Sequence, residues 1–92
     1  MKRLLSCTSS EMLKMDGQEL KQAILASEGR TVMTETVVAI EPLLGDLTNA
    51  ELAVSFGSDM VLLNCFDCNH PEIKGLPACD NPVDKLKEIV GR

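Results

Sequence analysis

The residues best suited to chemistry gather in the stretch LLNCFDCNHPEIKGLPAC, which begins at Leu62. Cys65, Cys68, His70 and Cys79 together offer the three sulfur atoms and one nitrogen of a tetrahedral zinc site. Two observations argue against zinc. No glycine follows Cys68 to make the tight turn of a zinc knuckle. Cys65 is predicted to lie in a strand with its side chain directed away from the Asn64 face, where it cannot easily converge with a loop cysteine. Zinc is therefore kept only as the weaker alternative.

The two thiols of Cys65 and Cys68 also have the C-x-x-C spacing of a redox dithiol. Such a pair needs a helix amino terminus, where the helix dipole lowers the thiol pKa. Here Asn69-His70-Pro71 follows, which predicts a loop, and Asp67 would raise the pKa of the neighbouring thiols. We therefore expect Cys65 to be a small buried hydrophobic residue and Cys68 and Cys79 to be loop residues.

Glu35 is the first candidate for catalysis, because it lies inside the β-branched segment TVMTETVV. Alternation along a strand puts Glu35 on one face with Met33 and Val37. A carboxylate in a strand covered by helices is costly unless it is paired or coordinates a ligand. Glu35 is thus a candidate general base or metal ligand; the alternative is a salt bridge to a Lys or Arg of a later strand.

Three further candidates follow the second predicted strand. Asn64, on the face of Met60 and Leu62, is a candidate substrate-binding amide; the alternative is a side chain that bonds local backbone. Asp67 is a candidate catalytic or metal-binding carboxylate, or simply starts a turn. His70 is a candidate general acid or base, or an exposed loop residue. Glu41, in the first long loop, is a weaker candidate.

Capping signals and hydrophobic periodicity predict an α/β chain. The expected elements are helices after capping boxes at 8–11 and 16–19, a strand at 31–38, a helix after a capping box at 48–51, a strand at 59–66, and a helix from 82 to 90. In the second helix the predicted apolar stripe is Leu20, Ala23, Ile24 and Leu25, with Gly29 ending the helix. The strand at 59–66 is almost wholly apolar, as expected for a parallel strand covered on both faces.

The lengths of the connections are unequal. Helix-to-strand turns are minimal, whereas the loops at 39–47 and 67–80, which follow the strands, are long. Long connections at the carboxyl ends of parallel strands are where α/β proteins build their sites. Gly91-Arg92 repeats Gly29-Arg30, after which a strand begins, so we expect a third strand to follow and the 92 residues to be the first part of a larger protein.

Composition narrows the function classes. A net charge of -5, scattered basic residues and only two aromatic residues argue against nucleic-acid binding. MKRLL is followed by polar residues rather than an apolar segment, so no signal peptide is predicted, and no apolar run approaches the length of a membrane span. We expect a cytoplasmic protein with reduced thiols and no membrane partner.

The segments ASEGRTVMTETVV, TNAELAVSFGSDMVLLNCFD and NPVDKLKEIVGR resemble the start of TIM-barrel proteins. They are most similar to a group of uncharacterised bacterial barrels labelled phosphoenolpyruvate phosphonomutase-like. The resemblance implies the first two strand-helix units of a (β/α)8 barrel, with amino-terminal helices at 1–29 and the two units at 30–92. It also implies lyase or mutase chemistry assisted by Mg²⁺, with most metal ligands beyond residue 92.

We therefore expect part of a cytosolic enzyme that acts on a small anionic or carbonyl-containing metabolite. Glu35, Asp67 and His70 would be catalytic and Asn64 would bind substrate, although these residues alone are not expected to form a complete enzyme. The alternative is a non-enzymatic α/β module that associates with further copies of itself and binds a metal or a partner through the cysteine-rich loop.

Overall fold

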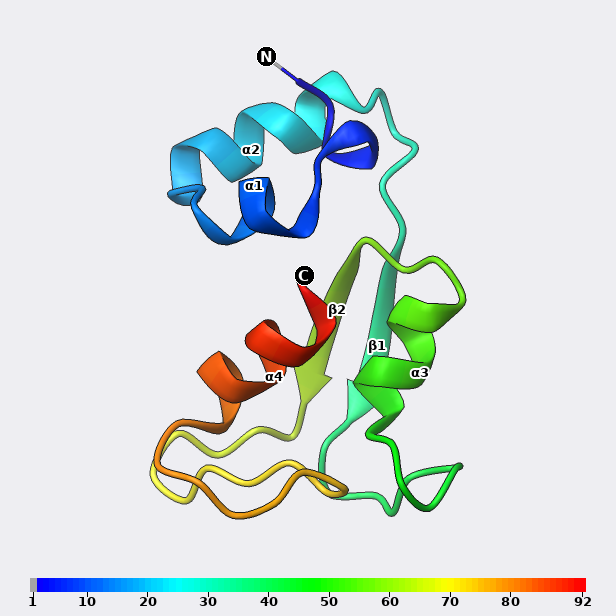
Figure 1. Cartoon of the computed structure of the whole chain (residues 1–92), viewed down its shortest axis with the longest axis vertical. Helices are drawn as coiled ribbons and strands as arrows, with labels where there is room; N and C mark the ends of the chain where they lie inside the picture. The colour runs from blue at the N-terminus through cyan, green and yellow to red at the C-terminus, as the bar shows by residue number, and fades with distance from the viewer. Residues whose placement is uncertain (1) are drawn as a thin grey trace.

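Two parallel strands form the one sheet seen in residues 2–92, the residues described by this computed structural model (Figure 1). Strand β1 (Met33–Val37) pairs with β2 (Met60–Asn64) in a register that runs from Met33 opposite Met60 to Val37 opposite Asn64. Helix α3 (Asn49–Ser55) connects them. The expectation of an α/β chain with parallel strands is confirmed, since a strand-helix-strand unit brings consecutive strands side by side in one direction.

The remaining helices are η1 (Leu4–Ser6), a single 3₁₀ turn, α1 (Ser9–Leu13), α2 (Gly17–Ala26) and α4 (Pro82–Val90). The three predicted capping boxes form, at Thr8, Asp16 and Thr48. At α4, Asn81 accepts a hydrogen bond from the Asp84 amide, and Gly91 ends the helix with φ 69°. These starts and stops were predictable because each depends on side chains within one helical turn.

The cap of α3 is the one that is buried, so it carries the clearest prediction for stability. The Thr48 hydroxyl accepts a hydrogen bond from the Glu51 amide at 3.1 Å and donates one to the Glu51 carboxylate at 2.8 Å. We expect Thr48→Ala to lower the free energy of unfolding by about 1–2 kcal/mol, measured by urea denaturation. Thr48→Ser, which keeps the hydroxyl, should recover most of the loss. Equal losses in both variants would assign the effect to methyl packing instead.

The amino-terminal helices have a small core of their own. Leu4, Ala23 and Ser27 are fully buried, and the Leu4 amide donates a hydrogen bond to the Ser27 hydroxyl at 3.1 Å. The predicted stripe of α2 is correct for Ala23 but wrong for Leu25, which is exposed. The helix is short and packs along one narrow line, so a residue two positions from Ala23 falls outside the contact.

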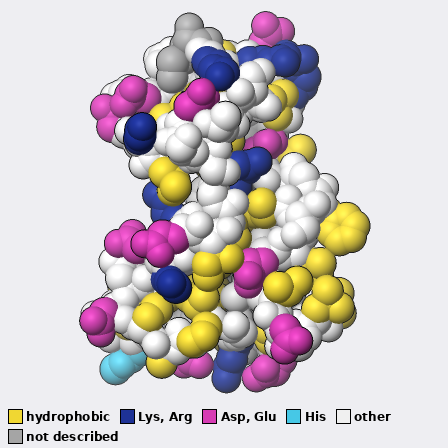
Figure 2. All heavy atoms as spheres, in the orientation of Figure 1, with side chains coloured by type: hydrophobic (Ala, Val, Ile, Leu, Met, Phe, Trp, Pro, Cys, Tyr) yellow, Lys and Arg dark blue, Asp and Glu magenta, His cyan; other side chains and the backbone are white. Residues whose placement is uncertain are grey.

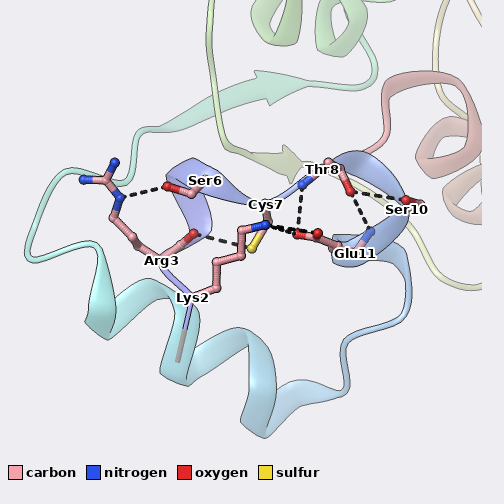
Figure 3. Close-up of polar contacts among 7 residues, drawn as sticks. All are labelled: Lys2, Arg3, Ser6, Cys7, Thr8, Ser10 and Glu11. Atoms are coloured by element: carbon pink, nitrogen blue, oxygen red, sulfur yellow. Dashed lines mark hydrogen bonds and ion pairs between the residues drawn. The ribbon is translucent and has the colours of Figure 1, made fainter.

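An ion pair joins the start of the chain to α1 (Figure 3). Lys2 Nζ lies 3.1 Å from both carboxylate oxygens of Glu11, and the Thr8 amide also donates to this carboxylate. These hydrogen bonds, that of Lys2 first, lower the pKa of Glu11. Because the pKa of Glu11 is lower in the folded chain than in the unfolded chain, its carboxylate stabilises the fold at pH values above the pKa of the unfolded state. This contribution is lost as the pH falls through the pKa of the folded state. The pair is exposed, so the effect is small.

The sheet packs on the helices through one face. Val38, Ala50, Ile73 and Leu86 form the buried cluster, and Val61 and Leu63 of β2 pack against it. The other face of the sheet remains open: Met33 and Leu62 are exposed. The prediction of a strand covered on both faces is therefore wrong for residues 2–92, because the helices of a strand-helix-strand unit lie together on one side of the sheet.

The ends of the elements differ in detail from the prediction. Helix α2 ends at Ala26, and the first residue with positive φ is Glu28, at 54°, rather than Gly29, which follows at 79°. Strand β2 ends at Asn64, two residues earlier than expected. The unequal connections are nevertheless present: residues 27–32 and 56–59 lead into strands, whereas the longer segments 38–48 and 65–81 follow them.

Candidate functional site

Both long loops lie at the carboxyl ends of the strands, at the bottom of Figure 1, whereas α1 and α2 lie at the opposite end. Loop 65–81 returns to the end of β1, where the Lys74 amide donates a hydrogen bond to the Val38 carbonyl at 2.9 Å. Ile73, one residue earlier, is buried in the main cluster. The loop is therefore fixed to the sheet. Together with loop 38–48 it forms a rim around the carboxyl ends of the two strands.

Glu35 and Asn64 lie on the same open face of the sheet. The register sets Glu35 opposite Leu62 and Val37 opposite Asn64, and paired residues of parallel strands point to the same side. Both side chains are exposed. Within residues 2–92 the Glu35 carboxylate has neither a hydrogen bond nor an ion pair, so its oxygens are free to accept a proton, a metal ion or a ligand donor.

Asp67 and His70 lie together in a turn after β2. The Asn69 amide donates a hydrogen bond to Asp67 Oδ1 at 2.8 Å, and the His70 amide donates to the Asp67 carbonyl at 3.2 Å. One carboxylate oxygen of Asp67 therefore already stabilises the turn, as the alternative interpretation had it. The His70 side chain is exposed. These two residues form part of the rim, and within residues 2–92 no hydrogen bond or ion pair joins them to Glu35.

Lys74 is a residue of this rim that the sequence analysis did not single out. Its Nζ lies 3.7 Å from carboxylate oxygens of both Glu41 and Glu72, so it joins the two long loops. Such long, exposed pairs contribute little to stability, and the ammonium group remains able to attract an anion. Nothing in the local sequence marks Lys74; only the return of the loop to β1 brings it beside Glu41.

The cysteine-rich stretch differs from its prediction. Cys65 is not buried in the strand: it follows the end of β2, has φ 65° and is exposed, as are Cys68 and Cys79. A residue with positive φ cannot continue the strand, so the chain turns into the loop one residue after Asn64. In the part of the chain described, no three His, Cys, Asp or Glu side chains come close enough to hold a metal ion.

The open face of the sheet provides some, but not all, of the ligands that a hard cation such as Mg²⁺ requires. Glu35 and Asn64 offer carboxylate and amide oxygens, the ligands that Mg²⁺ accepts in proteins. Two such side chains are too few for a site made by residues 2–92 alone. A cation held here would need further oxygen ligands from water, from substrate or from additional strands.

Comparison with protein families relates the whole of this α/β unit to one group. The model of a family described as a domain of unknown function, DUF7916, matches residues 5–92. The chain belongs to this family. Comparisons with curated proteins and with solved structures gave no match. The family match covers both strands, both long loops and all the candidate residues, and its description states no reaction.

Across residues 2–92 no helix combines the length and the apolar character needed to cross a bilayer. The longest helix, α2, has ten residues.

Proposed function

We propose that this DUF7916 chain supplies the first two strand-helix units of a (β/α)8 barrel whose other strands come from outside these residues. The barrel would be an enzyme similar to the phosphoenolpyruvate phosphonomutase-like proteins. Its substrate would be a small anionic or carbonyl-containing metabolite, and its lyase or mutase chemistry would be assisted by a divalent cation such as Mg²⁺. Glu35 would act as base or metal ligand, Asn64 would bind substrate, and Asp67 and His70 would belong to the rim.

The observation that carries this proposal is the position of Glu35 and Asn64 on the face that the helices leave open. In a (β/α)8 barrel the helices cover the outside of the strands, and the opposite face lines the interior. Side chains near the carboxyl ends of that inner face carry the chemistry in such enzymes. An unpaired carboxylate and an amide on this face offer oxygen ligands to a divalent cation, and a cation held there would offset the negative charge of Glu35 and attract an anionic substrate.

The proposal predicts a weak, cation-dependent ligand site at the open face. Pyruvate, which combines a carboxylate with a carbonyl group, is added to ¹⁵N-labelled protein with and without MgCl₂. We expect amide shifts at Glu35, Leu62 and Asn64 that grow when Mg²⁺ is present. Glu35→Gln should weaken the apparent affinity by about tenfold to a hundredfold, since a hydrogen bond or ion contact to a charged group contributes about 1.5–3 kcal/mol.

The matched control is Glu88→Gln, which removes a carboxylate from the exposed face of α4. It lowers the net negative charge by the same amount and should leave the pyruvate shifts unchanged. Shifts confined to other parts of the chain, or an affinity that Glu35→Gln does not alter, would contradict the proposed site.

The metal-binding form of the alternative module has no comparable support. Its four ligands would be Cys65, Cys68, His70 and Cys79, and no three of these side chains converge in the described residues. Self-association, the other half of that alternative, stays a prediction.

A further inference from the structure

Loop 65–81 carries three exposed thiols at the rim of the candidate site. Cys65, Cys68 and Cys79 all belong to this loop, and each is open to solvent. The one histidine of the chain, cyan in Figure 2, projects from the surface at the same end of the molecule. Cys7 lies among the amino-terminal helices at the opposite end, is partly buried, and donates a hydrogen bond to a backbone carbonyl at 3.4 Å. A small-molecule oxidant therefore meets its most accessible thiols beside the candidate site.

Two of these thiols stand at the ends of one short, anchored segment. The chain leaves β2 at Asn64, and Cys65 and Cys68 both lie in turns of the loop. Phe66, between them, packs against the main hydrophobic cluster and so fixes the segment to the body of the protein. Cys65 is thus held at the surface next to the strand end rather than buried in the strand, and it is available to react.

The backbone of Cys65 has a conformation that is unusual for a cysteine. Its φ is 65°, and Glu28 is the only other non-glycine residue of residues 2–92 with a positive φ. Glycine occupies this region without cost, whereas a residue with a side chain is strained there. Strain of this kind is concentrated at functional sites and switch regions. A cysteine at this turn is therefore better explained by the chemistry of its thiol than by local folding.

Residues 65–68 can close into the small ring that a disulfide requires. A disulfide needs Cα atoms about 4.4–6.8 Å apart, whereas the ends of an extended four-residue segment lie about 10 Å apart. The turns at Cys65 and Cys68 already bend the segment away from the extended form. Within residues 2–92 its only hydrogen bond to another backbone group is the one that the Asp67 carbonyl accepts from the His70 amide. Little in the backbone therefore resists the tightening that would join the two sulfur atoms.

We propose that Cys65 and Cys68 form a reversible disulfide, which makes the loop after β2 a redox switch beside the candidate site. The oxidant is a small-molecule disulfide such as oxidised glutathione. One cysteine, as its thiolate, attacks this disulfide and releases the first glutathione; the second cysteine then attacks the mixed disulfide and releases the other. The two protein thiols are oxidised, the glutathione disulfide is reduced to two thiols, and the two protons pass through solvent to the released thiolates.

The pair is suited to regulation rather than to catalysis. It lies in a loop, so it lacks the helix amino terminus that activates the thiols of a catalytic oxidoreductase. Exposed and strained disulfides are the readily reduced ones that serve as switches. The bond would therefore form and break with the redox state of the surroundings.

The disulfide would alter the candidate site through its immediate neighbours. Asn64 directly precedes Cys65, and Asp67 lies inside the ring. The Asn69 amide, which donates to Asp67 Oδ1 at 2.8 Å, directly follows Cys68. Drawing Cys68 toward Cys65 would strain this turn and shift the end of β2. The regulation of the site rests on the proposed function, whereas the formation of the disulfide does not.

The test begins with the reduced chain and an equimolar amount of oxidised glutathione, in dilute solution so that bonds between chains are disfavoured. Of the four free thiols two should disappear, with a loss of mass of about 2 Da, and peptide mapping should place the bond between Cys65 and Cys68. Dithiothreitol should restore all four. A chain that keeps four thiols, or that forms only bonds between chains, would refute the switch.

Two serine variants identify the partners. In Cys65→Ser the thiol of Cys68 has no neighbour to complete the exchange, so we expect a mixed disulfide with glutathione and no internal bond. Cys79→Ser is the matched control, because it removes another exposed thiol of the same loop. It should form the internal bond as the unmodified chain does. An internal bond that persists in Cys65→Ser, or that is lost in Cys79→Ser, would overturn the pairing.

Amide spectra of the ¹⁵N-labelled chain test the effect on the site. We expect oxidation to shift the amides of Asn64 and Asn69, both in the unmodified chain and in Cys79→Ser. An internal disulfide that leaves Asn64 unshifted would refute the regulatory role. The pyruvate titration keeps the two proposals apart. Binding through Glu35 without any internal disulfide would refute the switch and keep the site, whereas a disulfide in a chain that does not bind pyruvate would keep the bond and refute the site.

Discussion

Replacing Leu86 with alanine is expected to lower the free energy of unfolding by about 2–5 kcal/mol. Leu86 is 4% exposed and belongs to the main cluster with Val38, Ala50 and Ile73. The cluster is small, and Leu86 is its one fully buried side chain from α4, although Val90 of the same helix also packs against it. A domain of this size has little stability to lose, so the variant should be largely unfolded at room temperature.

The measurement is urea denaturation followed by circular dichroism, at one fixed protein concentration because self-association alters apparent stability. Ile89→Ala is the control, since Ile89 lies on the same helix but is 46% exposed. It should cost a fraction of the loss at Leu86, because less apolar surface returns to water. Equal losses at the two positions would mean that α4 does not pack through Leu86 as described.

Replacing Gly75 with alanine should detach loop 65–81 from loop 38–48. Gly75 has φ +92°, and a Cβ atom there would lie 2.6 Å from Pro42 Cγ and 3.4 Å from Thr48 Cα. The backbone conformation alone costs an L-residue about 1–3 kcal/mol. The proline ring cannot rotate away, so the overlap adds to this cost. We expect a loss of unfolding free energy together with amide shift changes around Lys74 and Glu41.

Gly29→Ala separates the cost of the backbone conformation from the cost of the steric overlap. Gly29 also has a positive φ, +79°, but a Cβ atom there would meet nothing within 4 Å. It should therefore show the backbone penalty without the overlap, and without any change at the rim. A loss at Gly75 no larger than that at Gly29, with Lys74 and Glu41 undisturbed, would show that the contact between the loops does not depend on this glycine.

Local signals in the sequence were sufficient for the helix boundaries and for the class of fold. The three capping boxes and the Asn81-Pro82 start of α4 depend on side chains one turn apart, so they could be recognised without the tertiary structure. Alternation in TVMTETVV also predicted the face that Glu35 shares with Met33 and Val37, because side chains of any strand alternate. The pairing of β1 with β2 followed from the strand-helix-strand order.

Tertiary contacts decided the features that no local pattern encodes. Cys65 lies outside β2 because the chain leaves the sheet at Asn64 and then returns to bury Ile73. Nothing in the sequence distinguishes Ile73 from the other apolar residues of its loop. The same return brings Lys74 to Glu41. One face of the sheet stays open because both neighbouring helices pack on the other. The sequence by itself thus determined which side chains share the candidate face, and only the packing decided that this face stays uncovered within residues 2–92.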